Sequence, residues 1–185
     1  MMGIHVSHQA NDLESIPRLR KDLLVAYLAA AAVTTHVLEA ALPGPGPWFK
    51  PGLANVFTLV AFCRFGWRAA MAVTLIRILV SSMALGILFT PGFFLSFFGA
   101  TGAVLMLGVV RLLPLGLGPV GISLLAAMAH MVAQTVAAWL LIIGHVGIFS
   151  ALPWFLAGSW ISGILNGLLA FLLLERLDQH HHLQR

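Results

Sequence analysis

Residues 73–100 read VTLIRILVSSMALGILFTPGFFLSFFGA and contain two long apolar runs, with the dipeptide Pro91–Gly92 between them. This dipeptide favours a tight turn, so the sequence predicts two helices here, Trp67–Phe89 and Phe93–Val110. Each is close to the roughly 20 apolar residues that a helix needs to cross a bilayer. The stretch is therefore typical of two membrane-spanning helices, and one charged residue, Arg77, lies inside the first of them.

The composition of the whole chain indicates the same class of protein. Of its 185 residues, 60% are hydrophobic and only 9% are charged, whereas a soluble domain has about 25% charged residues. Mean hydropathy is +0.98. These values exclude a soluble enzyme, a nucleic-acid-binding domain and a disordered chain. The net charge of +4 does not indicate a nucleic-acid partner, because the basic residues form no dense patch.

Four further apolar runs predict the rest of the bundle: Leu23–Leu42, Leu53–Cys63, Val120–Ile143 and Pro153–Leu174. The second of these runs is too short to cross the bilayer alone, so we expect a half-span or a helix that uses the adjoining loop. That loop, PGPGPWFKPG (43–52), holds four prolines and three glycines and cannot be helical.

The basic residues predict the topology. With the N-terminus inside and six crossings, only Lys50 lies outside and Arg77 lies within the membrane. Eight basic residues then lie inside, namely Arg18, Arg20, Lys21, Arg64, Arg68, Arg111, Arg176 and Arg185. Cytoplasmic loops carry such an excess of basic residues. With a re-entrant second helix, the basic residues would no longer lie mostly on one side. We therefore expect an all-α, six-transmembrane-helix bundle in a bacterial cytoplasmic membrane. A cytoplasmic segment (1–22) precedes the transmembrane domain (23–174), and a cytoplasmic tail (175–185) follows it.

Polar residues inside the apolar runs are the best guide to function, because ionisable groups in a membrane interior cost several kcal/mol unless they are paired or solvated. At a rise of about 1.5 Å per residue, several of them fall at similar depths in the outer half of the membrane. An outward-opening cavity with the 43–52 loop as its lid would explain this convergence. The candidate substrate-binding residues are His36, Glu39, Asn55, Arg77, His130, Gln134 and Asn166.

Spacing supports common faces within this set, since His36 and Glu39 are three residues apart and His130 and Gln134 are four apart. Two interpretations of the charges stay open. Glu39 and Arg77 could form a structural ion pair. Alternatively, Arg77 faces an anionic group of a ligand, and Glu39 orients Arg77 or faces a cation. The two histidines fit either a ligand site or a hydrogen-bonded core.

Small residues mark two surfaces for close helix packing. The last apolar run carries a stripe that favours packing against a neighbouring helix: Gly158, Ser159, Ser162, Gly163, Asn166, Gly167 and Ala170. The first run carries a patch that either packs internally or docks another membrane subunit: Ala26, Ala29, Ala30 and Ala32.

The sequence lacks the motifs of a catalytic chain. Its six acidic residues are not spaced to bind a catalytic metal. It has no phosphate-binding glycine loop and no GxSxG nucleophile motif. The single Cys63 can form neither an internal disulfide nor a multi-thiolate metal site. We therefore expect a protein that is not an enzyme, with no cofactor and no metal site.

Four segments together resemble one known family. They are PGLANVFTLVAF (51–62), the 73–100 stretch quoted above, GPVGISLLAAMAHMVAQ (118–134) and SGILNGLLAFLLL (162–174). In their order and spacing, with Asn55, Arg77, His130, Gln134 and Asn166 in place, they resemble the Gx transporter family. That family is also named heptaprenyl diphosphate synthase component I. The resemblance covers residues 23–174. Members often have asparagine where this chain has Met131.

The resemblance implies a bundle similar to the S components of energy-coupling factor transporters. Such proteins bind a vitamin or similar nutrient from outside, under a first-loop lid. They dock through small residues on the first helix to a shared ATP-driven module. The implied function is a substrate-binding subunit that captures a small molecule, with membrane lipid, the ligand and an energy-coupling module as partners.

Two other functions stay open. One is a non-catalytic membrane accessory subunit of polyprenyl (heptaprenyl) diphosphate synthesis, whose catalytic chain would be separate and soluble. The other is a structural or assembly protein without a ligand.

Overall fold

The computed structural model describes residues 3–41, 52–113 and 116–183, and the regular structure in these ranges is helical. Five helical stretches are long and apolar enough to cross a membrane, and α2 is a shorter apolar helix. The chain is therefore a multi-pass membrane protein. Its helices are α1 (Gly3–Ala41), α2 (Ala54–Phe65), α3 (Trp67–Ala84), α4 (Pro91–Leu112), α5 (Pro119–Ala138) and α6 (Leu152–Leu183), with a π-helical turn η1 (Trp139–Ile143) and a 3₁₀ turn η2 (Val146–Ala151) before α6.

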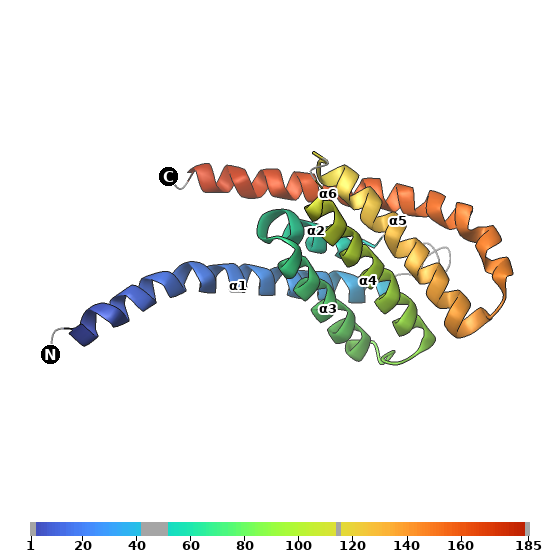
Figure 1. Ribbon diagram of the computed structural model, residues 1–185, viewed down its shortest axis with the longest axis horizontal. Helices are drawn as coiled ribbons and strands as arrows, with labels where there is room; N and C mark the ends of the chain where they lie inside the picture. Colours follow the sequence, from blue (N-terminus) through green and yellow to red (C-terminus); the bar gives the residue numbers. More distant parts are fainter. Residues whose placement is uncertain (1–2, 42–51, 114–115, 184–185) are drawn as a thin grey trace.

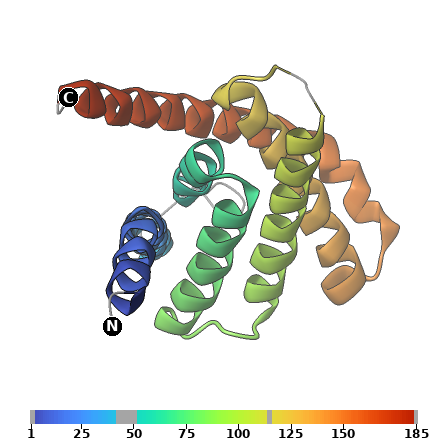
Figure 2. The same ribbon diagram turned by 60° about the vertical axis from the view of Figure 1, so that its left-hand side comes forward.

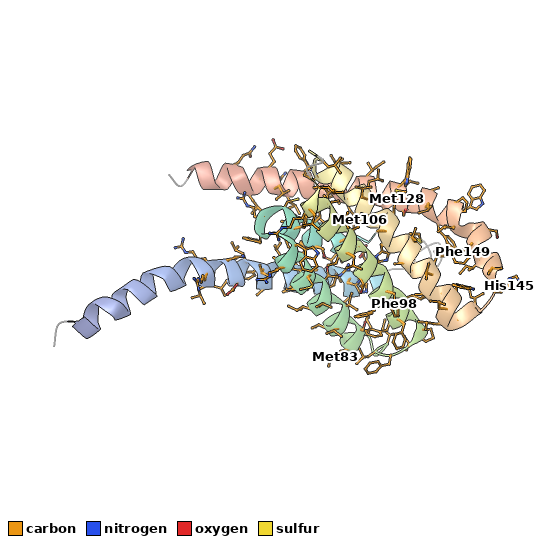
Figure 3. All side chains as sticks on the ribbon, in the orientation of Figure 1. Met83, Phe98, Met106, Met128, His145 and Phe149 are labelled. Atoms are coloured by element: carbon orange, nitrogen blue, oxygen red, sulfur yellow. The ribbon has the colours of Figure 1, made fainter. Side chains whose placement is uncertain are left out.

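The helices form one bundle in which consecutive helices run in opposite directions (Figure 1). The start of α1 and the end of α6 project from the same end of this bundle, as both ribbon views show (Figures 1 and 2). The outer surface carries large exposed apolar side chains, among them Met83 and Phe98 (Figure 3). Such a surface is typical of helices that face lipid.

The short helix α2 lies at the centre, in contact with α1, α3, α5 and α6. Val56, Leu59 and Val60 belong to one core cluster, and Ala61 belongs to a second cluster with residues of α1 and α3. At 12 residues and about 1.5 Å per residue, α2 is only about 18 Å long. A hydrocarbon core of about 30 Å is thus longer than α2. The start of this helix is partly buried, since Ala54 is buried whereas Leu53 and Asn55 are half-buried.

Three helix ends differ clearly from the predicted ends, and α5 passes into the π-helical turn η1 after Ala138. α1 begins at Gly3 and α6 continues to Leu183, so the polar segments prolong the first and last helices. α3 ends at Ala84 rather than near Phe89. Gly86 and Phe89 adopt positive φ angles of 66° and 63°, which end the helix before the turn into α4. Pro91 begins α4, and the Thr90 hydroxyl accepts a hydrogen bond from Phe93 N.

Glycines let α5 pack closely against both of its neighbours. A Cβ atom at Gly102 of α4 would lie 2.5 Å from Ala133 Cβ of α5. On the other side of α5, a Cβ atom at Gly167 of α6 would lie 2.6 Å from Val120 Cα. This contact confirms the predicted packing role of the small-residue stripe. The alanine patch on α1 is divided, because Ala29 and Ala32 are buried whereas residues 26 and 30 are exposed.

Substitution of Gly167 by alanine is expected to destabilise the bundle by roughly 1–3 kcal/mol, because the new methyl group would overlap the α5 backbone. Gly158→Ala is the matched control on the same helix, since a Cβ atom there has no neighbour within 4 Å. It should be neutral, or stabilising by up to about 1 kcal/mol through helix propensity. Unfolding midpoints in lipid nanodiscs measure both effects. Equal midpoints for the two variants would contradict the close α5–α6 contact.

Candidate functional site

The start of α2 needs hydrogen-bond acceptors from other parts of the chain. The first N–H groups of a helix have no partner within that helix, and in a membrane an unsatisfied group costs several kcal/mol. Glu39 of α1 satisfies one of them, because Leu53 N donates a hydrogen bond of 2.8 Å to Glu39 Oε1. Glu39 is only 9% exposed. A carboxylate at this position also interacts favourably with the positive end of the helix dipole.

Arg77 of α3 binds the second residue of α2. It is 5% exposed on α3, and its Nη1 donates a hydrogen bond of 2.8 Å to Asn55 Oδ1. Within the described ranges Arg77 forms no ion pair with Glu39, although the two charges are near enough to interact electrostatically. The direct partner of Arg77 is therefore Asn55. Its Nε is buried and has no hydrogen-bond partner among the described residues.

Asn166 of α6 completes the arrangement around the turn that precedes α2. It is 3% exposed, and its Nδ2 donates to Gly52 O at 3.3 Å. Gly52 has a φ of +65°, where a side chain would be strained, and a Cβ atom there would lie 3.0 Å from Asn55 Nδ2. Four predicted residues from four helices thus meet at this point. We call Glu39, Asn55, Arg77 and Asn166 the α2-start cluster.

His130 and Gln134 form a second polar group on α5. Their side chains are joined at 3.1 Å, between His130 Nε2 and Gln134 Oε1, which confirms that they share a face. The imidazole lies against α4, where a Cβ atom at Gly99 would come within 2.6 Å of Nε2. His130 and Arg77 are near enough to interact electrostatically.

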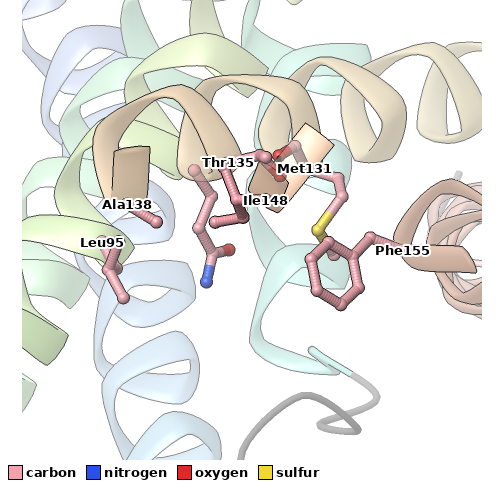
Figure 4. A pocket seen from close by; sticks show the side chains of 7 residues that line it. Leu95, Met131, Thr135, Ala138, Ile148 and Phe155 are labelled. Carbon is pink, nitrogen blue, oxygen red and sulfur yellow. Dashed lines mark hydrogen bonds between the residues drawn. The ribbon is translucent and has the colours of Figure 1, made fainter. Parts of the chain in front are cut away.

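Gln134 also lines a recess near the α5–α6 connection (Figure 4). The volume of this recess is about 10 Å³, which is room for about one water molecule. It is therefore too small for a nutrient-sized ligand. Met131 of α5 is part of its wall. The lining residues are Leu95, Met131, Gln134, Thr135, Ala138, Ile148 and Phe155.

The structure says less about two other predicted parts of the site, His36 and the lid. His36 lies one turn before Glu39 on α1 and is half-buried. The predicted lid, 43–52, falls outside the described residues except for Gly52. No group of three or more His, Cys, Asp or Glu side chains that could hold a metal ion is present in the described ranges.

Sequence reasoning missed the two backbone groups on which the cluster converges, Gly52 O and Leu53 N. The Pro51–Gly52 dipeptide directly before an apolar run was the available signal. Sequence reasoning also missed a hydrogen bond of 3.2 Å between the Thr58 and Thr74 hydroxyl groups, which joins α2 to α3. Thr74 lies one turn before Arg77, so this bond helps to fix the arginine beside α2.

Comparison with known proteins gives one match. The family model described as heptaprenyl diphosphate synthase component I matches residues 28–173. This range contains all of the candidate site residues. No curated protein and no solved structure matches the chain.

Proposed function

We propose that this chain, which belongs to the heptaprenyl diphosphate synthase component I family, is a substrate-binding membrane subunit. In this proposal it captures a small molecule from the outside of the bacterial cytoplasmic membrane, as S components of energy-coupling factor transporters do. The observation that carries the proposal is the α2-start cluster. It gathers a buried arginine, a buried carboxylate and two amides from four helices around the first residues of a short helix.

A purely structural role explains this cluster incompletely. A buried charge needs a partner of opposite charge and filled hydrogen bonds. The carboxylate of Glu39 accepts its hydrogen bond from the backbone at Leu53. Arg77 is bonded to a neutral amide, and its buried Nε has no partner in the part of the chain that the structure describes. A helix that begins inside the membrane with its N-terminus among such groups is a typical substrate site of transporters.

The direction of capture follows from a topology with six crossings. The start of α1 and the end of α6 project from one side of the bundle (Figure 1), which supports an even number of crossings. In this proposal the short apolar helix α2 counts as the sixth crossing. The basic residues fit this arrangement, since Arg111 lies near the α2–α3 junction, where a Cβ atom at Gly66 would be 3.6 Å from Arg111 Nη1. The basic end of α2 then faces the cytoplasm, and its start faces outward.

A partner is also part of the proposal, since the sequence has no ATP-binding glycine loop. The exposed side of α1 carries two small residues, Ala26 and Ala30, beside the exposed Tyr27. We propose that this face of α1 contacts an energy-coupling module.

A second candidate function is favoured by the family description itself. A component I implies another component, so the chain would be a non-catalytic accessory subunit of heptaprenyl diphosphate synthesis. This alternative requires a soluble synthase partner. It gives no role to Arg77 Nε, which lacks a partner within residues 3–41, 52–113 and 116–183.

Native mass spectrometry of the protein, extracted gently from its own membranes, separates the two functions. We expect a stoichiometric small polar molecule, or co-extracted ATPase and transmembrane coupling subunits. A synthase partner or a bound polyprenyl lipid would contradict substrate capture and support the accessory subunit. A chain with neither ligand nor partner would favour a structural protein.

A further inference from the structure

The charges at the α2-start cluster restrict the kind of ligand that it can bind. Arg77 contributes one positive charge and Glu39 one negative charge, and both side chains are buried. The N-terminal end of α2 adds about half a positive unit. Together these charges amount to about half a positive unit. A ligand with one negative charge would therefore leave only a small net charge at the cluster. A ligand with two or three negative charges would leave a large net negative charge inside the membrane.

The hydrogen bonds at Arg77 indicate where the anionic group would bind. Arg77 uses Nη1 to bind Asn55 Oδ1, and its Nε is buried without a partner among the described residues. Guanidinium groups bind two oxygen atoms of a carboxylate or of a phosphate through parallel hydrogen bonds. The charge balance therefore decides between these two groups. Leu53 N already donates a hydrogen bond to the carboxylate of Glu39. The backbone at the start of α2 is therefore able to bind this kind of group.

We propose that the α2-start cluster binds the carboxylate of a monoanionic small molecule, with Arg77 Nε as a principal donor, and discriminates against phosphate and diphosphate groups. This inference rests on the proposed function. It also bears on the alternative function, since a prenyl diphosphate is the kind of group that this charge balance disfavours.

Calorimetric titration of the full chain in lipid nanodiscs, at constant ionic strength, tests the proposal. The probes are benzoate and phenylphosphonate, which share a ring and differ in charge, together with pyrophosphate. We expect benzoate to bind at least about tenfold tighter than either phosphorus compound. Arg77→Gln should weaken benzoate binding by roughly ten- to hundredfold, because a charged hydrogen bond is lost. Arg68→Gln, an exposed position on the same helix, should leave it unchanged.

Glu39→Gln tests the charge balance without removing Arg77. The amide oxygen can still accept from Leu53 N, but one negative charge is gone. We expect the preference for benzoate over phenylphosphonate to shrink at least about threefold in this variant. The proposal is overturned if the wild-type chain binds no benzoate or binds a phosphorus compound at least as tightly. It is also overturned if Glu39→Gln leaves the preference unchanged, or if a folded Arg77→Gln variant binds benzoate normally.

These outcomes are separate from those that decide the proposed function. A neutral or cationic nutrient found by native mass spectrometry would leave substrate capture intact and overturn only the carboxylate proposal. A synthase partner without a small ligand would overturn substrate capture, whatever anions the cluster binds.

Discussion

Exchange of the two membrane charges, as Glu39→Arg with Arg77→Glu, is expected to restore little of the stability that either single reversal removes. Each reversal leaves a buried charge without compensation and should cost roughly 3–5 kcal/mol. In a simple ion pair the double exchange would restore the attraction. Here Glu39 also accepts a hydrogen bond from Leu53 N, and an arginine can accept none. It would also place a positive charge at the positive end of α2.

Unfolding midpoints of the single and double variants in nanodiscs measure this effect, and we expect the double exchange to recover less than about 1 kcal/mol. Glu39→Gln is the matched control, because it keeps an acceptor for Leu53 N. It should lose only about 1–2 kcal/mol, less than Glu39→Ala, which also leaves that N–H unsatisfied. Full recovery in the double variant would show that Glu39 and Arg77 act as a plain ion pair.

Asn55→Asp is expected to preserve the fold but to weaken ligand binding at the α2-start cluster. The aspartate would occupy the position of Asn55 Oδ1, 2.8 Å from Arg77 Nη1, and would supply the negative charge that we assign to the ligand. A buried ion pair roughly balances its own desolvation cost, so stability should change by less than about 1 kcal/mol. Ligand retention should fall roughly ten- to hundredfold, because the guanidinium is already neutralised.

Two measurements on the same preparation separate these effects: the bound fraction by native mass spectrometry and the unfolding midpoint. Asn55→Ala is the comparison variant, since it removes the partner of Arg77 without adding charge. It should lower stability by roughly 1–3 kcal/mol. If Asn55→Asp retained the ligand as the wild-type chain does, Arg77 would not be the group that binds it.

The positions of the candidate residues along their helices could be predicted, but their partners could not. His130 and Gln134 are four residues apart, so helix geometry alone brings them together. The partner of Arg77, Asn55, is 22 residues away, and their contact depends on how α2 packs against α3. Glu39 binds a backbone N–H at residue 53, a contact that no side-chain pattern reveals.

The same distinction holds for the fold. Apolar run length located the membrane helices to within a few residues, because burial in lipid requires a continuous apolar stretch. It failed where other forces decide the helix ends. The polar residues before Leu23 continue α1 without an apolar run. The apolar residues before Phe89 leave α3 because the backbone turns at Gly86.

The central claim is that α2 crosses the membrane with its start open to the outside, and two cysteines ten residues apart can test it. Cys63 is exposed near the far end of α2. Leu53→Cys, made together with Cys63→Ser, places a single thiol at the start of the helix. A membrane-impermeant maleimide should label Cys63 only from the cytoplasmic side and Leu53→Cys only from the outside. Labelling of both positions from the same side would show that α2 is re-entrant and would contradict the account.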